Sequence, residues 1–259
     1  MKQITAFAAV LATALAPWAA RGAAFAFSSQ ERFVSLEDVA RATSELDQAA
    51  DFSAYDADLG GGQVTQTSSL EATRILAVTQ HDVVARTLAE AGDVAEHFVV
   101  ESSFATDFTL DAAADYTLDA ELAVLGYVTD VHEFFPWFDN QLVLEASLVG
   151  PSGSVFEAAF DLQAECGFQQ NCSFQEPLSQ AGVLEPGSYT LTVRSFAIAE
   201  SNIICVGFGC SNQIPIASAS DGSASVDLHI VPEPGRNGAL ASGVVLLGAL
   251  ARGRCRRRR

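Results

Sequence analysis

The chain has 259 residues, of which 32 are Asp or Glu and 14 are Lys or Arg, and its formal net charge is −18. Residues 27–235 hold all 32 negative charges against five arginines, so this part alone carries a formal net charge of −27. So acidic a surface repels phosphate backbones, which argues against nucleic-acid binding and favours basic partners or divalent cations.

Residues 1–26 have the layout of a secretory signal peptide. Lys2 supplies the positive start, residues 4–16 form a short apolar run, and Ala24-Phe25-Ala26 matches an A-x-A cleavage site. We therefore expect export, with signal peptidase as a processing partner and a mature chain that begins near Phe27.

Residues 27–62 show the least regular pattern, and we expect an irregular segment with a short surface helix. Ser35 and Asp38 have the spacing of a capping box, and the apolar residues that follow keep helical spacing up to Leu46. Three glycines at 60–62 then separate this segment from the rest.

Residues 63–230 predict an antiparallel β-sandwich, of a jelly-roll-like kind, because apolar and polar side chains alternate with a period of two. The fold class is therefore mainly β, with helix expected in the terminal signals. Residues 74–91 fit a strand in their first half and a helix in their second, and stay open. The clearest strands are Phe104–Leu110, Tyr116–Val124, Leu142–Leu148, Phe156–Leu162, Tyr189–Val193 and Ala224–Ile230.

Two close pairs of cysteines lie in the exported part, and we expect each pair to form a local disulfide because exported chains meet an oxidising compartment. Cross-paired or free thiols stay open as alternatives. A four-cysteine zinc site is disfavoured, since neither spacing is that of a zinc knuckle. The four residues are Cys166, Cys172, Cys205 and Cys210.

Four aromatic residues cluster in the connection between two predicted strands: Phe134, Phe135, Trp137 and Phe138. Aromatic faces stack on sugar rings, so this segment is a candidate glycan contact. The alternatives are a loop that covers the open end of the core, or a protein interface.

The sequence contains no pattern that supports catalysis. Its four histidines lack metalloprotease spacing, and neither a nucleophile elbow nor a phosphate-binding loop is present. Asp56 and Asp58 have the first two spacings of a calcium loop, but the later ligands are missing, so they form only a weak calcium candidate. We therefore predict a non-enzymatic protein without a cofactor or a dedicated metal site.

Residues 231–259 consist of three parts in a fixed order. The motif Val231, Pro232, Glu233 and Pro234 resists helix formation. Residues 238–251 form an apolar stretch of about 21 Å as a helix, shorter than the roughly 30 Å of a hydrocarbon core. A basic stop follows, which positive charge would hold at the cytoplasmic face. It consists of Arg252, Arg254, Arg256, Arg257, Arg258 and Arg259.

This tail resembles the PEP-CTERM sorting signal of Gram-negative bacteria, although its apolar stretch is short and Cys255 interrupts the basic run. The resemblance implies processing by an exosortase, transient insertion in the inner membrane, and delivery to the cell surface or extracellular matrix. Carriers of this tail are associated with exopolysaccharide and biofilm, so an extracellular polysaccharide is the expected partner. The alternative functions are a secreted carbohydrate-binding module or a glycan hydrolase.

Overall fold

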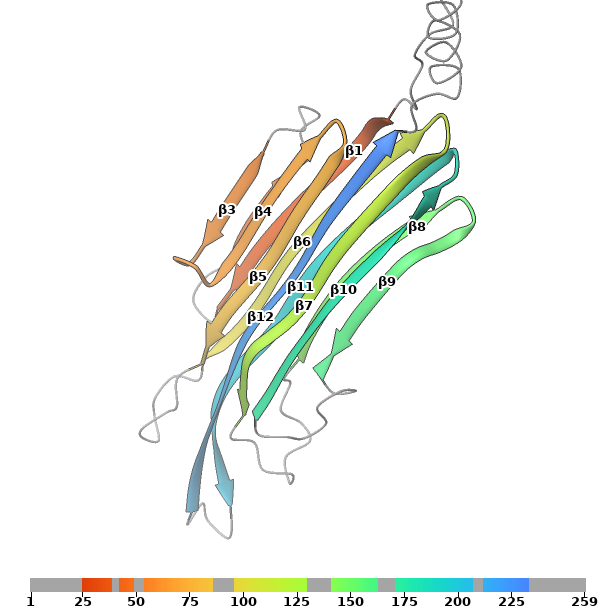
Figure 1. Ribbon diagram of the computed structural model, residues 1–259. Coiled ribbons are helices and arrows are strands. Elements are labelled where there is room, and N and C mark those ends of the chain that lie inside the picture. Colours follow the sequence, from red (N-terminus) through yellow and green to blue (C-terminus); the bar gives the residue numbers. More distant parts are fainter. Residues whose placement is uncertain are drawn as a thin grey trace, which may run out of the picture.

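A computed structural model describes residues 25–38, 42–48, 54–85, 96–129, 141–162, 171–206 and 212–232. These residues form twelve β-strands (Figure 1). The strands are β1 (Phe25–Glu37), β2 (Ala42–Asp47), β3 (Tyr55–Leu59), β4 (Val64–Glu71), β5 (Arg74–Val84), β6 (His97–Leu110), β7 (Ala114–Thr129), β8 (Gln141–Gly150), β9 (Gly153–Asp161), β10 (Asn171–Leu184), β11 (Gly187–Val206) and β12 (Asn212–Pro232).

The strands form two antiparallel sheets that lie face to face (Figure 1). In the first, which we call sheet A, the order is β2-β1-β6-β11-β8-β9. In the second, sheet B, the order is β3-β4-β5-β12-β7-β10. Beyond Ser201 the end of β11 pairs with the start of β12, which links the two sheets. The pairings confirm the predicted antiparallel sandwich, while they do not establish the finer jelly-roll order.

Alternation within each strand builds the core, because every second side chain points into the space between the sheets. The larger apolar cluster includes Phe104, Leu118 and Leu144, all fully buried. Phe108 stacks on Tyr189 with ring centroids 5.3 Å apart. Five of the six strands predicted most clearly from the sequence lie within strands of the structure, the sixth, Phe156–Leu162, passes the end of β9 by one residue, and Arg74–Val84 is also a strand.

The prediction of an irregular, partly helical segment at 27–62 is wrong, because these residues supply β1, β2 and β3. The backbone of β1 pairs with β6 from Phe25↔Leu110 to Glu37↔Val99. The fully buried Arg32 then joins the three strands: its Nη1 lies 2.8 Å from Asp47 Oδ2, and its guanidinium lies 5.2 Å from the centre of the Tyr55 ring. The sandwich therefore begins well before residue 63.

The first and the last described residues, Phe25 and Pro232, lie at the same end of the sandwich. Phe25 pairs with Leu110, and Pro232 pairs with Ala114, so only residues 111–113 separate their partners along the chain. We call this the terminal end. At the opposite, distal end lie the ends of β5, β7, β9 and β11 and the starts of β6, β8, β10 and β12 (Figure 1).

The predicted signal peptide and apolar tail lie almost wholly outside the described residues. Within the described ranges, no helix has the length and apolar character needed to cross a membrane. β1 begins at Phe25, two residues before the predicted start of the mature chain, and Phe25 packs on Phe27 and Phe108.

Candidate functional site: a groove on the outer face of sheet B

A shallow groove of about 380 Å³ lies on the outer face of sheet B. Four neighbouring strands, β5, β12, β7 and β10, each contribute two successive outward side chains to it. Cross-strand register places these side chains in two rows, one of Leu76, Asp227, Asp119 and Ser179, and one of Val78, Ser225, Glu121 and Pro177.

The shape of the groove follows from the size of the residues in these rows. Ser225 and Ser179 are small and leave a hollow between larger neighbours. Leu76 and Val78 form an apolar wall on β5, and Pro177 forms the opposite wall on β10. With strands about 4.8 Å apart, the groove spans roughly 14 Å across the sheet.

The carboxylate of Asp227 is neutralised within the protein. Arg74 binds it through two contacts, with Nε 2.9 Å from Oδ1 and Nη2 2.7 Å from Oδ2. His229 Nε2 also lies 3.2 Å from Oδ1. The hydrogen bonds from Arg74, followed by its positive charge, lower the pKa of Asp227 despite partial burial. Asp227 therefore stays ionised and already has its counter-charge.

The other two carboxylates in the groove have no cationic partner among the described residues. Glu121 accepts a hydrogen bond from the amide of Gln175, which is neutral. Asp119 is exposed and lies directly opposite Asp227 in the register of β7 and β12. Because Asp227 is already paired with Arg74, the carboxylates without a cationic partner among the described residues are Asp119 and Glu121, and these attract positive charge to this part of the groove.

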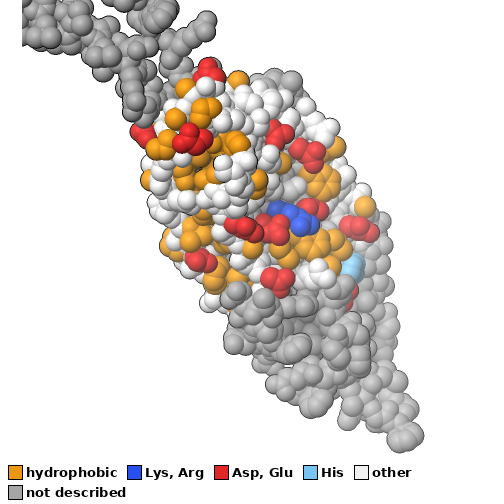
Figure 2. All heavy atoms as spheres, turned by 90° about the vertical axis from the view of Figure 1, so that its right-hand side faces the viewer, with side chains coloured by type: hydrophobic (Ala, Val, Ile, Leu, Met, Phe, Trp, Pro, Cys, Tyr) orange, Lys and Arg blue, Asp and Glu red, His pale blue; other side chains and the backbone are white. Residues whose placement is uncertain are grey.

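Acidic side chains are spread over other faces of the molecule as well. On the side shown in Figure 2, carboxylates lie among apolar side chains, and Lys or Arg side chains appear at one spot. In sheet A, Arg194 binds Glu101 at 2.8 Å and lies over the Phe196 ring at 5.3 Å. The described arginines, Arg32, Arg74 and Arg194, are thus each engaged by a carboxylate close by.

Most of the site residues predicted from sequence lie outside the described residues. These are Phe134, Phe135, Trp137, Phe138, Cys166, Cys210, Glu233, Pro234 and the arginines of the basic stop. Val231 and Pro232, the first half of the sorting motif, form the end of β12, where Val231 is 56% exposed. The side chain of Cys205 is not described. Cys172 is disulfide-bonded to a residue whose side chain is not described either, so the pairing with Cys166 stays a prediction.

The weak calcium candidate falls on a strand and its turn. Asp56 and Asp58 lie on β3, and Asp58 Oδ1 accepts a hydrogen bond of 2.6 Å from the backbone N–H of Gly62. Asp58 therefore has a local role in the turn between β3 and β4. In the described part of the chain, no three His, Cys, Asp or Glu side chains are grouped so that they could hold a metal ion.

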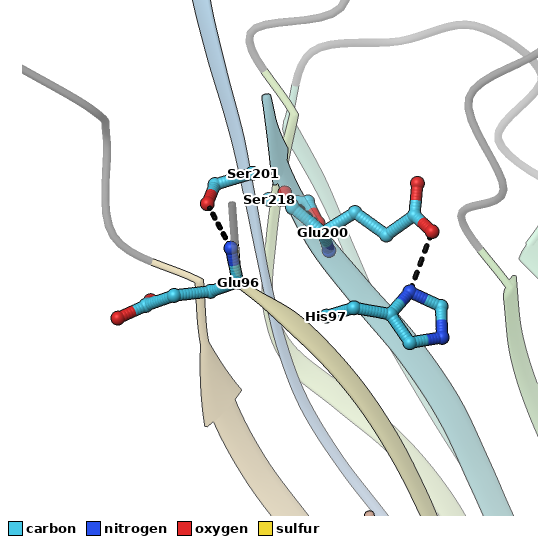
Figure 3. A network of polar contacts seen from close by, with 5 residues as sticks. All are labelled: Glu96, His97, Glu200, Ser201 and Ser218. Atoms are coloured by element: carbon cyan, nitrogen blue, oxygen red, sulfur yellow. Dashed lines mark hydrogen bonds and ion pairs between the residues drawn. The ribbon is translucent and has the colours of Figure 1, made fainter. Parts of the chain in front are cut away.

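A polar network lies where β11 leaves sheet A (Figure 3). His97 Nδ1 is 2.6 Å from Glu200 Oε1, while Ser201 Oγ accepts a hydrogen bond of 3.0 Å from the backbone N–H of Glu96. Ser218 Oγ accepts from the backbone N–H of Glu200 at 2.8 Å. Figure 3 shows the Ser201 hydroxyl and the His97 ring directed to different sides, so they do not form a nucleophile and base pair.

A buried histidine was not singled out from the sequence. His81 is fully buried, and its Nε2 lies 2.9 Å from Ser220 Oγ in the interior. Burial lowers the pKa of His81 to about 3, so the imidazole is neutral at physiological pH. Because it lies in a segment of ambiguous period, no local signal distinguished it from a surface histidine.

Comparisons with known proteins give no family for this chain. No protein-family profile matches it, and no curated protein matches it. Structural similarity extends to the infectious bursal disease virus VP2 subviral particle, with 9% identity, 83% of this chain and 62% of that chain covered, and a TM-score of 0.20. It also extends to the GH31 alpha-xylosidase of Xanthomonas citri, with 9% identity, coverage of 82% and 19%, and a TM-score of 0.19.

A third similar structure is TmCBM61 in complex with beta-1,4-galactotriose, with 10% identity, coverage of 60% of this chain and 88% of that chain, and a TM-score of 0.19. The chain spans less than two thirds of the VP2 chain and about a fifth of the xylosidase. At these TM-scores the similarity carries no argument about function.

Proposed function

We propose that this chain is an exported, non-enzymatic β-sandwich protein, displayed at the cell surface or in the extracellular matrix after sorting by an exosortase. The observation that carries the proposal is the pairing of Phe25 with Leu110 and of Pro232 with Ala114. The predicted leader and the predicted sorting tail are therefore attached to the same end of one sandwich.

This arrangement suits a module that is held at a membrane from one side during export. Both attached segments are apolar and carry positive charge, as a leader and a membrane stop require. β6 alone has 14 residues, about 46 Å at the usual rise per residue, so the distal end stands well away from the attached segments. The sandwich can then meet extracellular partners while its terminal end is still at the membrane.

The groove on sheet B favours a binding module over a glycan hydrolase. A hydrolase needs one carboxyl group with a raised pKa to act as general acid, beside a second that stays ionised. In the groove, Arg74 lowers the pKa of Asp227, so Asp227 cannot be the general acid, and its ion pair with Arg74 already engages the carboxylate that would have to act as the ionised partner. A carbohydrate-binding role therefore remains the second candidate function, and the groove is its candidate site.

The sorting proposal is tested by following the full chain in a Gram-negative host, with and without an exosortase gene. Substituting Glu233→Ala together with Pro234→Ala removes the half of the motif beyond β12. We expect the unprocessed form to accumulate in the inner membrane, as it should for the wild type in the host without the exosortase.

Pro186→Ala, in the short turn between β10 and β11, is the matched control, and should leave both mass and location unchanged. Immunoblots of inner-membrane, outer-membrane and medium fractions, with intact mass, provide the measurement. The same mass and location for every variant in both hosts would contradict the proposal.

A further inference from the structure

We propose that the groove on sheet B binds a glycan bearing free amines, such as a partly deacetylated hexosamine polymer. This inference deepens the proposed function, since it names the class of polysaccharide that a surface-displayed sandwich would meet. The inference is argued only from the two rows of outward side chains on β5, β12, β7 and β10 that line the groove.

Charge selects an amine over a neutral or acidic sugar. Asp119 and Glu121 have no cationic partner among the described residues, whereas Asp227 is occupied by Arg74 and His229. A bound ammonium group would pair with Asp119 or Glu121, which occupy successive outward positions of β7 in the groove. An acidic polysaccharide is disfavoured by a domain with a formal charge of −27.

The shape and polarity of the groove suit a sugar ring. A pyranose presents an apolar C–H face and a rim of hydroxyl groups, and the groove offers an apolar wall of Leu76 and Val78 facing Pro177. Ser225 supplies a hydroxyl between these walls, and Ser179 supplies one next to Pro177 on β10. Its volume of about 380 Å³ lies at the lower end of the range of small-molecule sites.

The groove lies on the face of the sheet, which argues against an added peptide strand. β-Augmentation needs a free strand edge, but β5, β12 and β7 each have neighbours on both sides. A ligand here must be recognised by side chains alone. No aromatic ring lines the groove, so we expect modest affinity for each site and a gain from a polymer that engages several copies.

The test uses the full chain, purified in detergent, and a glucosamine hexasaccharide, with an N-acetylglucosamine hexasaccharide of the same length as the comparison. Calorimetry at mildly acidic pH, where the amines are protonated, measures affinity. We expect binding of the amine form, weakening between about 50 and 300 mM salt as the charges are screened, and no binding of the acetylated form.

Asp119→Asn with Glu121→Gln should weaken binding about tenfold or more, because two charge contacts are lost. The matched control is Glu37→Gln with Glu157→Gln, which changes the net charge equally at exposed positions of sheet A and breaks no ion pair among the described residues. It should leave affinity within about twofold. Ser225→Tyr fills the hollow without changing charge and should also abolish most of the binding.

Three results would overturn the proposal. One is no binding of the glucosamine hexasaccharide, and another is an equal loss in the groove variant and the control, which would show a general charge effect. The third is tighter binding of an oligolysine of the same charge, which would assign the groove to basic peptides. The localisation test above does not involve these residues, so either proposal can fail without the other.

Discussion

Gln66 donates a hydrogen bond from Nε2 to the backbone carbonyl of Ser103, 2.6 Å away across the interior of the sandwich. Ser102 Oγ donates in the opposite direction, to the carbonyl of Thr65 at 2.9 Å. The two bonds connect β4 of sheet B with β6 of sheet A, and both side chains are fully buried. Directional polar links thus supplement the apolar contacts between the sheets at this edge.

Gln66→Ala should lower the free energy of unfolding by about 1–3 kcal/mol, since it removes a buried hydrogen bond and leaves a space. Urea unfolding followed by circular dichroism measures the change. Gln80→Ala, at an outward position on β5, is the control and should cost much less. Equal losses in the two variants would show that the link between the sheets contributes nothing measurable.

His81 should make the protein less stable as the pH falls below about 6.5. The pKa of His81 is about 3 when folded but close to 6.5 when unfolded, so the unfolded chain binds the proton first. The contribution of His81 to the free energy of unfolding is fully present above pH 6.5. It is lost progressively as the pH falls towards 3, at roughly 1 kcal/mol per pH unit. His81→Gln should flatten the slope of unfolding free energy against pH in that window. An unchanged slope would show that His81 does not titrate as its burial requires.

Gly222→Ala should destabilise the protein through the same histidine. A Cβ at position 222 would lie 2.9 Å from His81 Cε1 and 3.0 Å from Nε2, which is closer than ordinary contact. We expect a cost of about 1–3 kcal/mol in the wild type and a smaller cost in a His81→Ala background, where space is free. Thermal unfolding of the four proteins in the cycle measures the coupling. Additive effects would mean that the ring moves away at no cost.

Asp227→Asn should lower the melting temperature at neutral pH, but not at a pH low enough to protonate the wild-type carboxylate. Arg74 lowers the pKa of Asp227 in the folded state, so the stabilisation is present above the ordinary aspartate pKa and disappears as the pH falls through the lowered one. Differential scanning calorimetry across this range is the measurement. Asp119→Asn, which breaks no ion pair among the described residues, is the matched control. A loss that persists at low pH would contradict the assignment.

Reduction should destabilise the folded protein through Cys172. If its partner is Cys166, as the sequence predicts, the closed loop is short and the loss is about 2 kcal/mol in the chain-entropy account. Peptide mapping of the non-reduced protein identifies the partner directly. The Cys166→Ser and Cys172→Ser variants should then be equally destabilised and insensitive to reductant. Linkage of Cys172 to Cys205 or Cys210 would show the cross-paired alternative.

The helical spacing seen around Ser35 illustrates how local pattern can mislead. Val34 and Leu36 satisfy a period of two as well as they satisfy part of a helix, and both are buried in β1. Pairing with β6 and the buried contact from Arg32 to Asp47 decide between the two, and neither is visible in the sequence around position 35. Tertiary contacts outweigh propensity in such cases.

The groove could not have been found from sequence for a related reason. Its side chains come in pairs from 76–78, 119–121, 177–179 and 225–227, and each pair is an ordinary outward position of an alternating strand. Shifting one strand by a single residue would turn its two groove side chains into the core. The site is therefore a property of cross-strand register, which depends on all four strands together.

What the sequence by itself determined is the class of fold, an acidic domain of alternating strands, while two terminal segments with the layout of sorting signals predict an address. These are local properties, because hydrophobicity, charge and a period of two are read from neighbouring residues. Only the tertiary structure decided which strands share a sheet, that β1, β2 and β3 belong to the sandwich, and that Asp119 and Glu121 have no cation beside them among the described residues. Those features depend on pairing between residues far apart in the chain, and such pairing cannot be inferred from the pattern of neighbouring residues.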